Sequence, residues 1–365
     1  MNPSLDNARL DAASGLGPKE PAAFVVEVEG RRLLLDCGEG PEPGRLPDVE
    51  RIGRVDAVVL SHGHNDHVGA LRLLDRIGQP QVFATAPVLA RLKNITGHAI
   101  PIRGRCEILG IKVETGTDGH APGGVWLRLS VGDGLLYMGD YSLESRLYVF
   151  DHPPPTPTMI FDGSYGDAEE AIEPQHRRIL EILARGPALL PVPPDGRGPE
   201  LAMVLLEAGL DVAIDEQVRS VASMLTQAAR ESARPDSIPR LQRLIRDARR
   251  LDVDAEPKGV MVAHGGSGDA GVAGALIKRW ESKPDPTILF TGYVAAGTSG
   301  RRLVDSGRGL FQRWNVHPRA SDNLALIESV KPQRVIPAFG DSKYAAFWRS
   351  RMPQRQVLTA TPIAL

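Results

Sequence analysis

The sequence predicts an α/β protein of two domains, in which the second domain is inserted into the first. The chain has 365 residues, too many for one ordinary domain and close to the size of two. Short apolar segments typical of strands prevail over residues 24–165, whereas strand and helix patterns alternate over residues 167–314. Because such alternation indicates a parallel sheet covered by helices, we expect one domain over residues 1–166 and 315–365 and another over 167–314.

Hydrophobic periodicity gives the expected elements in order. The strands of the first region are Phe24–Val28, Arg32–Asp36, Ala57–Leu60, Gln81–Ala84, Ile111–Glu114, Val125–Val131, Leu135–Met138 and Met159–Phe161. The inserted region combines helices Arg177–Ala184, Glu200–Ala208, Gln217–Ala229, Arg240–Arg249 and Val272–Trp280 with strands Ala188–Val192, Val212–Ile214, Val260–Ala263 and Ile288–Phe290. Helix Asn323–Val330 and strand Arg334–Ile336 return the chain to the first domain, so we expect the active site in the cleft between the domains.

The composition favours a soluble cytoplasmic enzyme. Hydrophobic residues make up 42% of the chain, and no run approaches the ~18 apolar residues of a membrane helix. The first residues, Met1–Asp6, lack the basic and apolar regions of a secretory signal. Only two cysteines, Cys37 and Cys106, are present, which excludes a disulfide framework.

Three histidines and one aspartate lie within six positions after the expected strand Ala57–Leu60. The segment reads Ser-His-Gly-His-Asn-Asp-His and contributes His62, His64, Asp66 and His67. Imidazole and carboxylate are ligands of zinc and related divalent metals. A short loop of this kind can direct two histidines to one metal and the Asp-His pair to a neighbouring one. The segment therefore predicts a metal site.

This segment resembles the His-x-His-x-Asp-His signature of the metallo-β-lactamase fold superfamily, and further segments follow in that family's order. The strand ending at Asp36 resembles the first motif, which places a carboxylate behind the metal loop to orient its ligands. The turn around His120 resembles the third motif, and Gly139-Asp140 resembles the fourth. The resemblance implies an αββα sandwich holding two zinc ions, one on His62, His64 and His120 and one on Asp66 and His67, with Asp140 bridging both.

Later segments are similar to the β-CASP branch of this superfamily, which contains nucleases such as ribonuclease J, Artemis and the cleavage and polyadenylation endonuclease. Asp162 ends a strand before Ser-Tyr-Gly, as in motif A, and His317 resembles the motif B histidine. Between them, residues 259–280 and 291–302 resemble a glycine-rich loop with its helix and a Gly-Tyr segment of that branch. The likeness runs from about Phe24 to Asp341 and implies that the inserted domain is a β-CASP domain.

Two positions depart from the family pattern. Motif C normally supplies a histidine after a strand, but Phe339 stands there, and phenylalanine cannot ligate a metal. We therefore expect the second zinc ion to bind more weakly than the first, because its site would have only Asp66, His67 and Asp140 as protein ligands. The second departure is His264, where relatives tend to carry a small residue. A surface or capping histidine and a residue that reaches the cleft are both compatible with its position.

The net charge of −2 and isoelectric point near 6.5 are not those of a protein that is basic throughout. Phosphate contacts need only a local basic stripe, and two stretches offer one. Residues 301–319 contain five arginines and one acid, and residues 240–250 contain five arginines spaced mainly three to four apart. For the second stretch, a solvated helix face is the favoured interpretation.

The resemblance implies a metal-dependent phosphodiesterase that hydrolyses RNA or single-stranded nucleic acid through hydroxide generated between two zinc ions. His317 would bind the scissile phosphate or protonate the leaving oxygen, and Asp162 would orient His317. We therefore predict Asp66, His317 and Asp162 as catalytic residues. A hydrolase of a small ester, lactone or phosphoester and a non-catalytic nucleic-acid-binding relative stay open, as do RNA versus DNA and a homo-oligomeric state. No membrane partner is expected.

Overall fold

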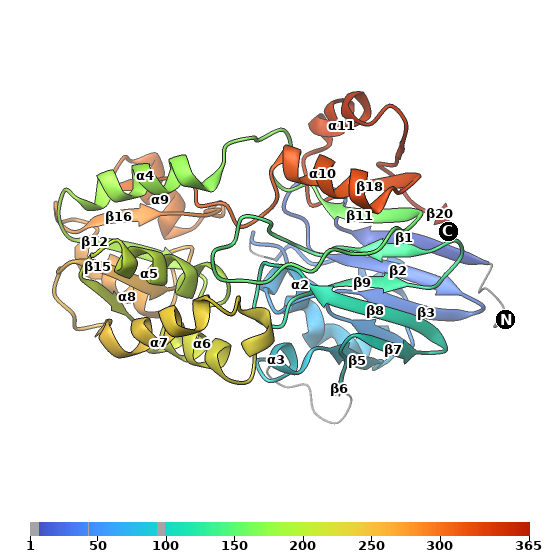
Figure 1. Ribbon diagram of the computed structural model, residues 1–365, viewed down its shortest axis with the longest axis horizontal. Coiled ribbons are helices and arrows are strands. Elements are labelled where there is room, and N and C mark those ends of the chain that lie inside the picture. Colours follow the sequence, from blue (N-terminus) through green and yellow to red (C-terminus); the bar gives the residue numbers. More distant parts are fainter. Residues whose placement is uncertain (1–6, 43, 93–98) are drawn as a thin grey trace. The chain divides into compact units, whose positions relative to one another are not determined.

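The computed structural model describes residues 7–42, 44–92 and 99–365 (Figure 1). Residues 1–6, from which we predicted that no secretory signal is present, lie outside these ranges. The chain divides into two compact units. Unit 1 comprises residues 1–143, 149–169 and 317–365, and unit 2 comprises residues 144–148 and 170–316.

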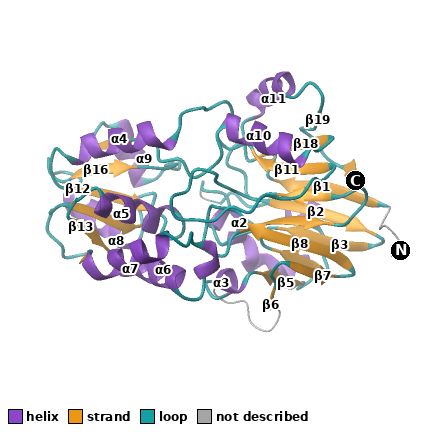
Figure 2. Ribbon diagram, in the orientation of Figure 1, coloured by secondary structure: helices purple, strands orange, loops and turns teal. Residues whose placement is uncertain are grey.

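Unit 1 contains two seven-stranded sheets, distinguished from its helices by colour in Figure 2. The first sheet has the order β20-β1-β2-β3-β4-β5-β6, with strands Ile363–Ala364, Ala8–Ser14, Ala23–Val28, Arg31–Leu35, Ala57–Val59, Gln81–Ala84 and Ala99–Pro101. The second has the order β19-β18-β11-β10-β9-β8-β7, with strands Gln356–Val357, Arg334–Ala338, Thr158–Asp162, Leu135–Tyr137, Val125–Leu129, Ile111–Thr117 and Arg105–Ile108.

The two sheets form the central layers of a helix-sheet-sheet-helix sandwich. Side chains alternate between the faces of a strand, so Leu33 and Leu35 of β3 face the layer between the sheets while Leu34 faces outward. Outside the first sheet pack α1 (Val49–Ile52), α3 (Ala86–Leu89) and the 3-10 segment η1 (Gly69–Ile77). Outside the second pack α10 (Ala320–Val330) and α11 (Ala345–Arg351). The predicted αββα sandwich is confirmed.

Unit 2 is a six-stranded sheet with helices on both faces. Its order is β14-β13-β15-β12-β16-β17, and every recorded pairing is parallel. The strands are Arg249–Arg250, Val212–Ile214, Val260–His264, Ala188–Val192, Thr287–Phe290 and Gly309–Phe311. The helices are α4 (Ile172–Leu183), α5 (Arg197–Glu207), α6 (Glu216–Thr226), α7 (Ser237–Asp247), α8 (Gly271–Trp280) and α9 (Ser299–Asp305). The predicted parallel α/β domain is confirmed.

The structure corrects the ends of several predicted elements; the predicted helix Gln217–Ala229, for example, ends at Thr226. The predicted helix Arg240–Arg249 ends at Asp247, and Arg249 and Arg250 form the short strand β14 instead. The pairing of β14 with β13 is a contact between distant residues, so the local charge pattern did not reveal it. Strand β1 was also missed, because its alanine-rich sequence has little of the β-branched character of strands.

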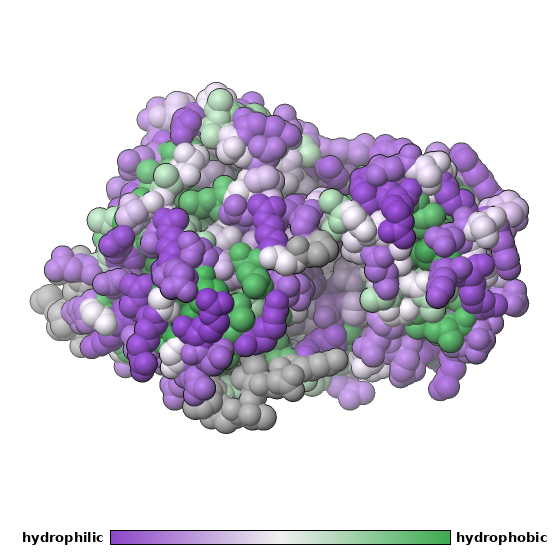
Figure 3. All heavy atoms as spheres, turned by 180° about the vertical axis from the view of Figure 1, so that it is seen from behind, coloured by the Kyte–Doolittle hydropathy of each residue, from purple (hydrophilic) through white to green (hydrophobic). Residues whose placement is uncertain are grey.

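No helix in the described part of the chain combines the length and the apolar character needed to cross a bilayer. On the face drawn in Figure 3, hydrophilic side chains prevail and apolar ones form small scattered groups.

Candidate metal centre

The predicted metal loop follows strand β4 and is bound by hydrogen bonds to the segment that follows strand β3. His62 comes shortly after β4, and His64 precedes the one-turn helix α2 (Asn65–Val68), which carries Asp66 and His67. Main-chain hydrogen bonds join this turn to the segment after β3, with Cys37 N–H donating to His67 C=O at 2.9 Å. A Cβ on Gly38 would lie 1.7 Å from the carbonyl oxygen of Asp66. The close approach therefore requires glycine and fixes the loop against the sheet.

Three imidazoles and one carboxylate converge in the first cluster. His64 Nδ1 lies 3.1 Å from His62 Nε2 and 3.0 Å from His120 Nε2. Asp140 Oδ2 lies 3.9 Å from His62 Nε2 and 3.7 Å from His120 Nε2. One donor atom from each of these four residues lies within 4.8 Å of all the others.

Asp140 also belongs to two neighbouring clusters. Asp66, His67 and Asp140 form the second, in which His67 Nε2 lies 3.4 Å from Asp140 Oδ1. Asp140, Asp162 and His317 form the third, in which Asp162 Oδ2 lies 2.7 Å from His317 Nδ1. The structure thus brings together all the residues that the sequence analysis proposed as ligands and catalytic groups.

The buried site perturbs the pKa values of its members. Burial and the neighbouring imidazoles of His67 and His64 lower the pKa of His62 well below its usual value. For His67, burial also lowers the pKa, but the charges of Asp140 and Asp36 outweigh it and hold the pKa well above the usual value. Burial would raise the pKa of Asp140, but His67 and His317 hold it well below its usual range. The metal-free site therefore favours a carboxylate surrounded by imidazoles.

These donors fit a zinc-type cation. Two nitrogens bound to one tetrahedral zinc at about 2.0–2.1 Å lie roughly 3.3 Å apart, close to the nitrogen separations between His64 and its two partners. In the absence of a cation, three imidazole nitrogens at such distances cannot all satisfy one another, since each neutral ring has one donor and one acceptor. A bound cation would accept their lone pairs. Uptake would displace the proton of His67, so affinity should rise with pH.

His317 is the least buried member of the third cluster, with 14% of its side chain exposed. Burial alone would lower its pKa, but the charges of Asp162 and Asp140 raise the pKa above the usual histidine value. The ammonium of Lys19, which the sequence analysis did not single out, acts in the opposite direction on this pKa. His317 is therefore an oriented imidazole whose two carboxylate neighbours favour its protonated form.

Phe339 occupies the position of the missing motif C histidine and packs against the second cluster. Its ring centroid lies 5.3 Å from that of His67 and 6.2 Å from that of Phe24, both in edge-like arrangements. Its backbone is left-handed, with φ of 61°, and its N–H donates to Gly15 C=O at 2.8 Å. Phe339 thus contacts a predicted ligand as an apolar wall.

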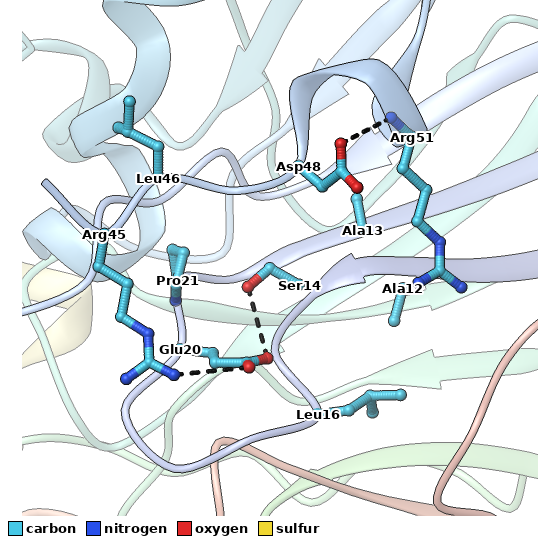
Figure 4. A pocket seen from close by; sticks show the side chains of 10 residues that line it. All are labelled: Ala12, Ala13, Ser14, Leu16, Glu20, Pro21, Arg45, Leu46, Asp48 and Arg51. Atoms are coloured by element: carbon cyan, nitrogen blue, oxygen red, sulfur yellow. Dashed lines mark hydrogen bonds and ion pairs between the residues drawn. The ribbon is translucent and has the colours of Figure 1, made fainter.

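The segment that meets Phe339 also borders a surface pocket of about 370 Å³ (Figure 4). Glu20 organises this segment, because its carboxylate accepts hydrogen bonds from the N–H groups of Gly15 and Gly17 at 3.0 and 3.1 Å. The same carboxylate pairs with Arg45 at 3.5 Å, as Figure 4 shows. None of the predicted site residues lines the pocket.

His264 lies in unit 2 at the end of β15, where it is paired with a carboxylate. Its Nδ1 lies 2.9 Å from Asp215 Oδ2, and 28% of its side chain is exposed. Asp215 also caps α6, since its Oδ1 accepts from Gln217 N–H and Val218 N–H. Within unit 2 no metal-ligand cluster includes His264 among the residues described.

Most arginines of the two basic stretches are engaged within the protein. In residues 240–250, Arg240, Arg243, Arg246 and Arg249 form ion pairs with Glu207, Asp247 and Asp211. In residues 301–319, Arg301 and Arg319 pair with Asp305 and Asp322, while Arg308 donates to three main-chain carbonyls. Partly exposed ion pairs of this kind contribute little to stability.

Two polar side chains of the centre were missed because their partners are distant in sequence. Ser61 and Tyr137 both donate hydrogen bonds to Asp36, at 2.7 and 2.5 Å. The apolar character of the strand Leu135–Met138 suggested burial for Tyr137 but gave no indication of its hydroxyl partner. The carboxylate of Asp118, another unexpected group, is buried and accepts from His120 N–H at 2.7 Å. Burial raises the pKa of Asp118 to about 8.

Comparisons with known proteins agree with this architecture. Residues 16–97 match the metallo-beta-lactamase superfamily and residues 207–303 match the Beta-Casp domain. The chain is 26% identical to transcription termination factor FttA of Methanothermobacter thermautotrophicus, over 94% of this chain and 69% of that protein. It is 25% identical to endoribonuclease ysh1 of Schizosaccharomyces pombe, over 92% of this chain and 54% of that protein. The chain thus spans about half to two thirds of the length of these relatives.

A solved structure shares the fold at low sequence identity. It is a protein of unknown function from Enterococcus faecalis, with a TM-score of 0.61 and 14% identity. The likeness covers 98% of this chain and 100% of that one.

Proposed function

Because residues 16–97 match the metallo-beta-lactamase superfamily and residues 207–303 match the Beta-Casp domain, we propose that the protein is a zinc-dependent nuclease acting on RNA or single-stranded nucleic acid. One observation carries the proposal: Asp140 is shared by three ligand clusters that together contain every predicted ligand and the His317–Asp162 pair. The names of the relatives, an endoribonuclease and a transcription termination factor, support RNA as the substrate class.

The proposed roles follow from the geometry of the side chains. His62, His64, His120 and Asp140 would hold one zinc ion, and Asp66, His67 and Asp140 would hold a second. When bound, such a pair supplies a nucleophile at neutral pH and stabilises charge on phosphate oxygens. Asp162 holds His317 by its Nδ1, which leaves the other ring nitrogen to donate a proton to the leaving oxygen. The charges of Asp162 and Asp140 raise the pKa of His317 and so favour the protonated form that a general acid needs.

We also propose that the second ion binds more weakly than the first. Phe339 places an aromatic ring where a further ligand would stand, and Asp66 and His67 are the only predicted protein ligands besides the shared Asp140. A zinc titration of metal-free protein should then show two unequal equivalents. Two equally tight equivalents would contradict this proposal.

The proposed domains are a metallo-β-lactamase domain over residues 1–166 and 315–365 and a β-CASP domain over 167–314. The cytoplasmic location and the oligomeric state stay predictions.

A cleavage assay tests the nuclease. Matched RNA and DNA oligonucleotides, each with and without a 5′ phosphate, should be incubated with zinc-loaded protein and with chelator-treated protein. We expect zinc-dependent cleavage of RNA or single-stranded DNA, and the pattern of products separates exonuclease from endonuclease action. A panel of small esters, lactones and phosphoesters run in parallel identifies the alternative hydrolase. Binding of oligonucleotide by zinc-loaded protein without any cleavage would contradict a catalytic role.

A further inference from the structure

The carboxylate of Asp36 is the meeting point of four hydrogen-bond donors behind the metal centre. Ser61 donates its N–H to Oδ1 at 2.7 Å and its hydroxyl to Oδ2 at 2.7 Å. His67 Nδ1 lies 2.7 Å from the same Oδ2, and Tyr137 donates its hydroxyl there at 2.5 Å. Asp36 is fully buried, and its backbone has a φ of 58°, so this side-chain position is imposed by its surroundings.

Tyr137 approaches this carboxylate from the opposite sheet. Asp36 follows β3 of the first sheet, whereas Tyr137 ends β10 of the second sheet. The phenol is fully buried in the layer between the sheets, where its ring lies 5.5 Å from that of Phe24. Burial and the Asp36 charge raise the pKa of Tyr137 well above its usual value, so its hydroxyl keeps the proton that it donates.

The end of β10 therefore acts on both nitrogens of His67. Asp140, three residues after Tyr137, faces His67 Nε2 at 3.4 Å, and Tyr137 acts on Nδ1 through Asp36. Since the carboxylate accepts the proton of Nδ1, Nε2, which faces Asp140 and the second cluster, is the nitrogen that would give up its proton to a cation. Phe339 borders the same ring.

We propose that Tyr137 is a positioning residue for the second metal position, acting through Asp36 to fix the tautomer and orientation of His67. The role is important in this chain because Phe339 supplies no ligand, so the second position depends on fewer protein donors. The inference rests on the metal site of the proposed function, but it does not depend on the substrate.

The test compares Tyr137→Phe with Tyr148→Phe, a matched variant that removes a buried hydroxyl bound to Gly196 C=O in unit 2. Metal-free proteins are titrated with Zn²⁺ against a chromophoric chelator. Partners behind the ligands typically change metal affinity by about 10–100-fold, so Tyr137→Phe should weaken the second equivalent by about that factor and leave the first unchanged. Tyr148→Phe should change neither. Equal weakening of both equivalents, or none, would overturn the proposal.

A second measurement follows the His67 imidazole directly in metal-free protein. The Nδ1 proton should give a slowly exchanging NMR signal in the wild type and exchange faster in Tyr137→Phe. Should Tyr137→Phe fail to fold, Ser61→Ala removes another donor from the same oxygen and should have the same effect on that signal. If wild-type protein takes up only one equivalent of zinc, the two-metal proposal fails, and the imidazole signal alone decides the role of Tyr137. An unchanged signal in the variant would then reject it.

Discussion

Each unit contains a buried aspartate paired with a partly exposed histidine, and the two pairs differ in their neighbours. In unit 1, Asp162 ends β11 and holds His317 at 2.7 Å, and the imidazole also lies 3.6 Å from Asp140. In unit 2, Asp215 follows β13 and holds His264 at 2.9 Å. The first pair adjoins the ligands of the metal centre, whereas the second caps a helix. We therefore expect a catalytic role only for the pair that has the third partner, Asp140.

The largest loss of activity is expected when a proposed metal ligand next to the Asp162–His317 pair is removed. His64→Ala deletes the imidazole whose Nδ1 lies closest to both other nitrogens of the first cluster. Zinc content should fall, and cleavage should drop to background while circular dichroism shows a folded protein. His152→Ala, which removes an exposed imidazole outside the clusters, serves as the control. Full activity in a metal-free His64→Ala preparation would refute the assignment.

The next largest effect on the cleavage rate is expected from the histidine of the first pair, and none from the histidine of the second. His317→Ala should slow cleavage by roughly 10²–10⁴-fold, the range for a lost general acid, with unchanged zinc content. His264→Ala should leave the rate unchanged, because Asp215 retains its helix-capping bonds. Rates and zinc content of both variants decide the matter. A slowed His264→Ala protein that has lost zinc would instead indicate that His264 replaces the missing ligand.

The aspartates provide the smallest and most specific contrast. Asp162 is the strongest charge that raises the pKa of His317, so Asp162→Asn should lower that pKa, measurable by NMR in metal-free protein. A general acid works in its protonated form, so the alkaline limb of the rate profile should move to lower pH. Asp215→Asn should leave the profile unchanged but lower the free energy of unfolding by about 1–3 kcal/mol, since its amide opposes two His264 donors. If the pH dependence of the cleavage rate is the same in Asp162→Asn as in the wild type, the Asp162–His317 pair does not take part in catalysis.

The same contrast explains what could be predicted from sequence. The proposed ligands His62, His64, Asp66 and His67 are neighbours in sequence, so their spacing alone predicted that they would gather at one site. Parallel strands in unit 2 followed from alternating patterns, because local periodicity reflects which face is buried. The partners of Tyr137 and His264 lie 101 and 49 residues away, so only tertiary packing brings them together. Strand β14 was misread for the same reason, since its pairing partner is distant.

The strand order of unit 1 also has consequences for the order of folding. Strand β11 pairs with β18, and β1 pairs with β20 at the far end of the chain. During synthesis, β11 therefore remains an unpaired sheet edge until residues beyond 338 emerge, while most of unit 2 is already available to fold. Long-range pairing of this kind is intrinsically slow, and exposed edges invite association with other chains. Nascent chains stalled between these strands should consequently depend most on chaperones.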